Sequence, residues 1–204
     1  MRFKTLLKTA LFGSAVFAAW QAKKVLTNKF TAERPSSRVE GTQDFEIRYY
    51  PPVVMATVVR TGGYKEMLKK GFKTLYGYLS GKNDVRQEIE MTKPMVVQYD
   101  DASGKGTMTL VLPKEYAMDK LPRPLSNKIN IHKTEGSYKA LLKFEGRADK
   151  IDFFSKQQEL MSILEGRNIA HEEAFEYFIY NDPMQLVQRE NAVAVSLKDF
   201  HPKG

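Results

Sequence analysis

Residues 71–98, which read GFKTLYGYLSGKNDVRQEIEMTKPMVVQ, decide the fold predicted for this chain. The stretch begins inside a helix predicted over residues 64–79, because four apolar side chains recur at spacings of four, three and four and so share one helical face: Leu68, Phe72, Leu75 and Leu79. The turn-forming residues at 81–84, Gly-Lys-Asn-Asp, end this helix. A strand follows over residues 89–99, and Pro94 within it indicates a sheet edge or a bulge.

The segments on either side of this stretch follow one plan twice. Two strands are predicted before the helix, at 45–49 and 53–59, and the strand at 107–112 completes the first half. A proline-rich connector at 113–127 leads to the second half, with strands predicted at 128–132, 138–144, 175–180 and 192–197 and a helix at 148–164. Each half reads strand–strand–helix–strand–strand, which is an internal repeat of pattern and not of sequence. The fold class predicted is α+β, a distorted mixed β-barrel or sheet with two main helices and an additional apolar helix at the N-terminus.

The first 42 residues predict a leader and a linker. Residues 9–20 are apolar and small and follow three basic residues, as in a secretory signal, and the wider segment 6–22 reaches the lower limit for a membrane span. A membrane anchor, a cleaved signal and an organelle transit peptide all stay open. The first two would place the protein on a membrane or outside the cytoplasm, on the periplasmic side if it is bacterial. The predicted organisation is a signal or membrane anchor at 1–24, a linker at 25–42, a globular domain at 43–198 and a tail at 199–204.

The net charge of +8 belongs mostly to the leader. Six of the 32 lysines and arginines, and none of the 24 acidic residues, lie in the first 30 positions. The body of the protein is therefore nearly neutral and lacks the basic surface on which nucleic-acid binding rests, so no nucleic-acid partner is expected. The chain has no cysteine, which excludes disulfides, thiolate metal ligands and a cysteine nucleophile.

The sequence contains no recognisable catalytic or metal-binding motif. Its three histidines, His132, His171 and His201, form no ligand pair, and there is no Gly-x-Ser-x-Gly, Gly-x-Gly-x-x-Gly or phosphate-binding loop. The paired acids at 100–101 and 172–173 fall in predicted loops, where solvated side chains are the ordinary case. We therefore expect neither an enzyme nor a metal site.

The helix predicted over residues 64–79 carries lysines and tyrosines beside its apolar stripe. Such a face suits a flat apolar ligand with carboxylates, whose rings would lie against leucine and phenylalanine while lysines meet the anions. The same pattern suits a core-facing stripe with a solvated lysine face, so the pattern alone leaves both interpretations open. The residues concerned are Tyr64, Lys65, Leu68, Lys69, Phe72, Lys73 and Tyr76.

Several short motifs, taken in order, resemble the SOUL haem-binding protein family. The resemblance covers about residues 43–198, nearly the whole body of the protein. Each motif is weak alone, and their order carries the assignment. They are FEIRYYPP at 45–52, GFKTLYGYLSGKND at 71–84, IEMTKPMVVQ at 89–98, VLPKEY at 111–116, Leu-Pro-x-Pro at 121–124, Phe-x-Gly at 144–146, Tyr-Asn-Asp-Pro at 180–183 and Arg-x-Asn at 189–191.

The resemblance implies a distorted barrel of two βαβ-like halves. It also implies non-covalent, non-catalytic binding of haem or another tetrapyrrole in an apolar groove beside the first helix. In the family a basic residue of that helix, matched here by Lys69, is proposed to meet a propionate, and Phe72 matches an apolar residue one turn later. Tyr49 stands where one branch of the family has an iron-ligating histidine, and tyrosine is itself a haem ligand. The site residues expected are Tyr49, Leu68, Lys69, Phe72, Lys73 and Tyr76.

A second class of function stays open. The two-half architecture also resembles bacterial regulatory ligand-binding domains and gyrase-inhibitor-like proteins, which implies effector sensing or protein interaction. A pocket with acids at its centre would favour that alternative, and lysines at a rim would favour haem. The partners expected are thus a tetrapyrrole ligand and, through the N-terminal segment, a membrane.

Overall fold

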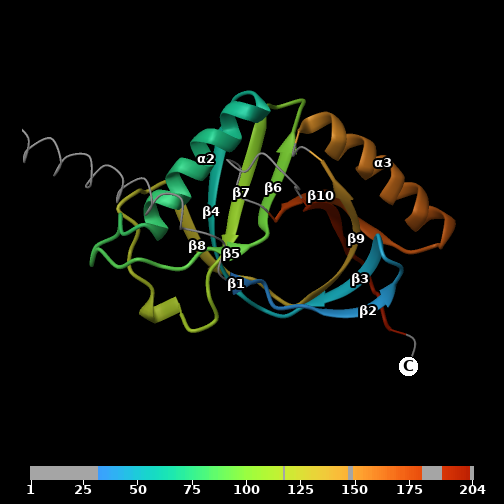
Figure 1. Cartoon of the computed structure of the whole chain (residues 1–204), viewed down its shortest axis with the longest axis horizontal. Helices are drawn as coiled ribbons and strands as arrows, with labels where there is room; N and C mark the ends of the chain where they lie inside the picture. The colour runs from blue at the N-terminus through green and yellow to red at the C-terminus, as the bar shows by residue number, and fades with distance from the viewer. Residues whose placement is uncertain (1–31, 117, 147–148, 181–189, 203–204) are drawn as a thin grey trace, which may run out of the picture.

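A computed structural model describes residues 32–116, 118–146, 149–180 and 190–202. The fold is α+β, as predicted, with two long helices packed on a large curved sheet (Figure 1). In chain order the elements are β1 (Ala32–Glu33), β2 (Ser37–Gly41), β3 (Phe45–Tyr50), β4 (Val54–Thr61), α2 (Tyr64–Leu79), β5 (Thr92–Lys93), β6 (Met95–Asp100), β7 (Lys105–Val111), the 3-10 helix η1 (Met118–Lys120), β8 (Ile129–Lys133), β9 (Ser137–Glu145), α3 (Lys150–Gly166), β10 (His171–Ile179) and β11 (Glu190–Leu197).

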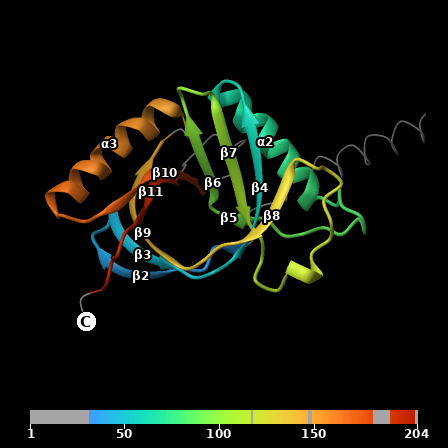
Figure 2. The same cartoon turned by 180° about the vertical axis from the view of Figure 1, so that it is seen from behind.

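Nine strands form one antiparallel sheet in the order β2-β3-β9-β11-β10-β6-β7-β4-β8. The predicted element order is present in each half, but β3 pairs with β9 of the second half and β8 with β4 of the first. This exchange ties the two halves into one sheet. The sheet curls into an open ring with both helices outside it, and its end strands β2 and β8 are not paired with each other in the described structure (Figures 1 and 2).

The polar segment before β3 belongs to the fold. A linker was predicted over 25–42, but β1 pairs in parallel with β5 and β2 pairs with β3, so the described part of that segment is ordered structure. Val39 is the one residue of β2 that is even partly buried, so the segment carries little hydrophobic periodicity to reveal a strand. The predicted leader helix at 1–24 lies outside the described residues.

Helix α2 spans the predicted residues 64–79, but its buried stripe is rotated from the predicted one. The residues against the sheet include Met67, Gly71 and Leu75, whereas Leu68 and Phe72 lie half-buried on the flank. Gly71 makes this possible, because a Cβ there would lie 3.3 Å from the Met108 side chain of β7. Glycine has no side chain to contribute to a hydrophobic pattern. The pattern therefore centred the buried face on Leu68 and Phe72, one residue further along the helix than Met67 and Gly71.

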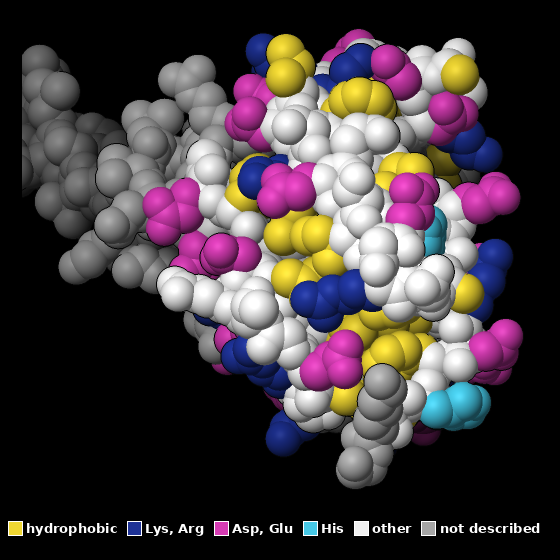
Figure 3. Space-filling view, turned by 90° about the vertical axis from the view of Figure 1, so that its right-hand side faces the viewer, with side chains coloured by type: hydrophobic (Ala, Val, Ile, Leu, Met, Phe, Trp, Pro, Cys, Tyr) yellow, Lys and Arg dark blue, Asp and Glu magenta, His cyan; other side chains and the backbone are white. Residues whose placement is uncertain are grey.

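Helix α3 packs on the sheet through three apolar residues, Phe153, Leu160 and Leu164. Phe153 is fully buried and stacks on Tyr177 at 4.5 Å between ring centroids, while Phe154 is 59% exposed. Ile151 is exposed as well, at 77%. Seen from the side that lies on the right of Figure 1, hydrophobic side chains appear in small groups separated by charged and polar ones (Figure 3). The helix begins at Asp149, whose carboxylate accepts two backbone hydrogen bonds of 3.0 Å from the first turn.

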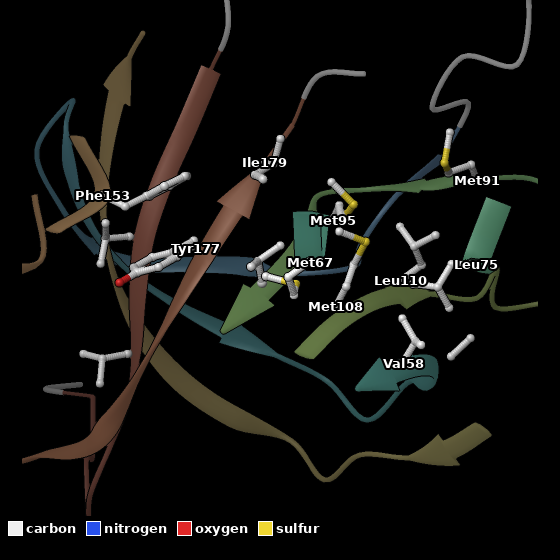
Figure 4. Close-up of a cluster of buried hydrophobic side chains, with 14 of the residues drawn as sticks. Val58, Met67, Leu75, Met91, Met95, Met108, Leu110, Phe153, Tyr177 and Ile179 are labelled. Atoms are coloured by element: carbon white, nitrogen blue, oxygen red, sulfur yellow. The ribbon is translucent and has the colours of Figure 1, made fainter. Parts of the chain in front are cut away.

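The two faces of the sheet hold separate apolar clusters. The larger cluster lies between the sheet and the helices, and Figure 4 shows its methionine-rich centre with Met67, Met95 and Met108. The smaller cluster, which includes Tyr50 and Phe178, contains no helix residue and lies on the inner face of the ring. Strand alternation produces this division, because neighbouring residues of one strand point to opposite faces.

Candidate functional site

One flank of α2 gathers five of the six predicted site residues. Leu68, Phe72 and Tyr76 are spaced four residues apart and form a half-buried row along the helix. The rings of Phe72 and Tyr76 are stacked, with centroids 5.6 Å apart and planes 23° from parallel. Leu68 and Phe72 pack their inner edges against the main core. The flank therefore offers a narrow apolar strip whose outer edge faces solvent.

A row of lysines runs beside this strip. Lys65, Lys69 and Lys73 are exposed and again four residues apart. None of the three forms an ion pair with a carboxylate of the described chain, whereas the neighbouring Lys70 is paired at 2.5 Å with Glu66, one turn before it on the helix. We call the six residues of the two rows the α2 flank: Leu68, Phe72 and Tyr76 with Lys65, Lys69 and Lys73.

The structure does not bring Tyr49 together with the α2 flank. Tyr49 lies on β3, and five strands separate β3 from β4, on which α2 packs. Its ring lies 5.1 Å from that of Tyr138, which in turn lies 5.3 Å from Phe200. Any side chain at Gly136 would collide with the Tyr49 hydroxyl. Tyr49 therefore belongs to an aromatic cluster in the other part of the sheet.

The inner face of the ring carries two pockets that the sequence analysis missed. The large pocket has a volume of about 550 Å³ and the small pocket about 240 Å³. Tyr50 and Tyr180 line the large pocket, and Lys139 and Glu176 line the small one. Arg34, which follows β1, contributes to both. Polar side chains that alternate along a strand are ordinarily assigned to solvent, which is why sequence patterns did not reveal a site on the inner face.

Arg34 is the most unusual charge of this inner face. Its side chain is almost completely buried, and its guanidinium lies 4.4 Å above the ring of Tyr50. Burial lowers the pKa of the Arg34 guanidinium, although the negative charge of Glu176 acts in the opposite direction. The Arg34 Nε is enclosed and has no hydrogen-bond acceptor in the described structure. Burial likewise raises the pKa of the Tyr50 phenol to about 12, so this hydroxyl is neutral at ordinary pH.

A second buried charge, Glu46 on β3, is fully paired. Its carboxylate accepts hydrogen bonds from Arg48 at 2.8 Å and Lys143 at 2.9 Å, and Arg38 approaches within 3.8 Å. Burial alone would raise the pKa of the Glu46 carboxyl, but the hydrogen bonds from Lys143 and Arg48 outweigh burial and lower it. This cluster ties β2, β3 and β9 together through one carboxylate.

The described residues contain no group of three His, Asp or Glu side chains that could hold a metal ion. His132 lines the small pocket alone, and His171 bonds a neighbouring backbone carbonyl. Neither α2 nor α3 combines the length and the hydrophobicity that a bilayer crossing needs, and no other described helix does.

Comparison with known proteins agrees with the motifs. The family model of the SOUL heme-binding protein matches residues 32–196. Human heme-binding protein 2 is 29% identical over 188 residues, covering 89% of both chains, and heme-binding protein 1 of Xenopus laevis is 27% identical over 160 residues, covering 76% of this chain and 83% of its own.

Among solved structures, the EcmrR C-terminal domain superposes with a TM-score of 0.57 at 8% identity, covering 76% of this chain and 98% of that domain. A hydrolase from Listeria innocua superposes with a TM-score of 0.54 at 11% identity, covering 78% of this chain and 94% of its own. At such low identities these two likenesses concern the fold alone. The family model, in contrast, matches most of the sequence, and this match shows that the chain belongs to the SOUL heme-binding protein family.

Proposed function

We propose that this protein binds haem or a related tetrapyrrole non-covalently, without catalysing a reaction, and that the α2 flank is the contact surface. The observation that carries the proposal is the pairing of two rows on one helix. An apolar strip with two stacked rings lies directly beside three lysines that have no acidic partner in the described chain. Family membership and the names of the relatives support the same ligand class.

The geometry of the α2 flank suits a flat ligand with acidic groups at its edge. One helical turn rises about 5.4 Å, so the lysine row offers positive charge at regular steps along the strip. A tetrapyrrole lying on Phe72 and Leu68 would bury apolar area that is now in contact with water, and its propionates would reach the lysines. Binding would break no existing ion pair of Lys69 or Lys73, because neither has one in the described structure.

With the ligand on the α2 flank, the iron of haem contributes little to the binding affinity. Tyr49, the residue that matches the histidine of one family branch, is held in a distant aromatic cluster. The α2 flank itself contains no histidine. We therefore expect that protoporphyrin IX without metal binds about as well as haemin, and that Tyr49→Phe leaves the affinity for both unchanged.

The test is a haemin titration of the full chain, followed by the Soret absorbance. Lys69→Gln should weaken binding by about tenfold, the value of one charge-assisted contact. Lys70→Gln is the matched control, because Lys70 is the next residue but lies outside the α2 flank and is paired with Glu66. Equal affinities of Lys69→Gln and Lys70→Gln would argue against the α2 flank as the site, and no saturable Soret change in the wild type would argue against the function.

The alternative of an effector-sensing or protein-interaction module has less support. It calls for a pocket with acids at its centre, which would receive an organic cation. The small pocket instead holds two buried cations, Arg34 and Lys139, while its two carboxylates are Glu176, which is paired with Lys139, and Glu135, which is exposed at the rim. Buried positive charge of this kind disfavours a cationic ligand.

We also propose membrane anchoring or export through residues 1–24, which lie outside the described structure. Membrane fractionation of the full chain and of a chain that starts at residue 25 tests this point. The full chain should remain with the membrane or be exported, and the shortened chain should do neither.

A further inference from the structure

We infer that the small pocket on the inner face of the sheet binds a small organic carboxylate, with Arg34 as the group that recognises it. This site lies on the opposite face of the sheet from the α2 flank and does not depend on the proposed tetrapyrrole function. The argument rests on three features of the pocket: an unpaired buried guanidinium, the balance of charge around it, and the polar groups that line it.

The guanidinium of Arg34 is buried without an acidic partner among the described residues. The residue is 4% exposed, and no carboxylate of the described chain lies within ion-pair distance of its side chain. Its Nε has no acceptor, and the ring of Tyr50 covers the planar group at 4.4 Å. A buried charge in a protein is ordinarily paired, so a guanidinium with no acidic partner among the described residues, at the wall of a cavity, points to a ligand that supplies the acid.

The charges around Arg34 determine which ligand charge the small pocket favours. Lys139 and Glu176 neutralise each other, since Lys139 Nζ lies 2.8 Å from Glu176 Oε2, and the same amine donates to Ser196 at 2.8 Å. Glu135, at the rim, is exposed, so water screens its charge. Among the described residues, the buried positive charge of Arg34 is therefore left without a balancing negative charge. A monoanion balances it, a cation is repelled, and a phosphate monoester with nearly two negative charges would overcompensate.

The remaining lining fits a compact carboxylate. A guanidinium presents its donors in a fork that matches the two oxygens of a carboxylate. His132 Nδ1 is enclosed and has no hydrogen-bond partner in the described structure, so it is available to a polar group of the ligand. Met55 and Val96 supply apolar contact. The volume of about 240 Å³ admits a small molecule and excludes a tetrapyrrole.

The experiment titrates benzoate into the full chain and follows the Arg34 Nε–H resonance in a nitrogen-15 correlation spectrum. We expect this resonance to shift with saturation at millimolar benzoate. Benzamide, which has the same shape and no charge, should leave it in place. Arg34→Gln should weaken benzoate binding at least about tenfold. Arg38→Gln is the control, because Arg38 is half-exposed and bonds the backbone carbonyls of the nearby turn.

A variant of opposite sign separates recognition from a loss of structure. Glu176→Gln removes the carboxylate that competes for the buried cations, so it should tighten benzoate binding several-fold, which damage to the fold could not do. Circular dichroism shows whether each variant is folded. If the Arg34→Gln protein is unfolded, the titrations of the wild-type and Glu176→Gln proteins still test the inference. The inference is overturned by an Arg34 resonance that benzoate leaves unmoved, by benzamide binding as tightly as benzoate, or by weaker binding to a folded Glu176→Gln protein.

Discussion

The buried carboxylate of Glu46 gives the sharpest test of how the inner face is held together. We predict that Glu46→Gln, which keeps the size of the side chain, destabilises the protein. The wild-type carboxylate accepts hydrogen bonds of 2.8 Å from Arg48 and 2.9 Å from Lys143, and Arg38 lies at 3.8 Å. Glutamine retains one acceptor, but its amide group would point donor hydrogens at a second cation.

The size of the effect follows from these contacts. A hydrogen bond to a charged group contributes about 1.5–3 kcal/mol to the free energy of unfolding. Both cations remain partly exposed in the fold, so water recovers part of the loss. We therefore expect a total cost of about 2 kcal/mol. For a domain of this size that cost lowers the melting temperature by roughly 4–8 °C.

The pH dependence of this cost has a definite sign. The pKa of the Glu46 carboxyl is lower in the folded protein than its ordinary value of 4.5. The stabilisation is therefore complete above that value and is lost as the pH falls through the folded pKa. Urea unfolding at a series of pH values should show a constant difference between wild type and Glu46→Gln at pH 5 and above, shrinking below it. Glu40, which is exposed and forms no ion pair with a described residue, provides the control Glu40→Gln, expected within about 0.5 kcal/mol of wild type. A Glu46→Gln protein as stable as the control, or a difference unchanged at pH 3, would refute the reasoning.

Two further predictions concern the packing of the helices. Gly106→Ala should cost about 1–3 kcal/mol, because its Cβ would lie 2.8 Å from a methionine side chain of α2 and 3.0 Å from a backbone oxygen, whereas Gly166→Ala, with open space around it, should not destabilise. Phe153→Ala should cost about 3–5 kcal/mol because the ring is fully buried, and Phe154→Ala at the exposed neighbouring position should cost less than about 0.5 kcal/mol. Urea unfolding measures both pairs, and similar losses within either pair would contradict the packing described here.

Much of the architecture could be predicted because its signals are local. The helix at 64–79 was predicted with its observed bounds, since its apolar period and its closing Gly-Lys-Asn-Asp turn both lie within the segment. Pro94 correctly marked an irregular strand, because the predicted strand at 89–99 divides there into β5 and β6. The exchange of β3 and β8 between the halves has no local signal, because strand pairing between distant segments is decided by the whole sheet.

The candidate sites could be predicted only in part. The α2 flank is a property of one helix, so its rows follow from residue spacing. The distance of Tyr49 from that flank could not be predicted, since it depends on the order of strands in the sheet. Arg34 was hidden for another reason: it lies in a polar segment that reads as a linker, and only the folding of β1 beside β5 buries it on the inner face.

The central claim is that the α2 flank is the tetrapyrrole site, and locating the ligand by NMR tests it most directly. Zinc protoporphyrin, which is diamagnetic, is added to the labelled full chain, and its ring current shifts the resonances of the residues that it covers. We predict the largest shifts at Leu68, Phe72 and Tyr76. Shifts that instead gather at Tyr50 and Tyr180, in the large pocket on the inner face, would contradict the account.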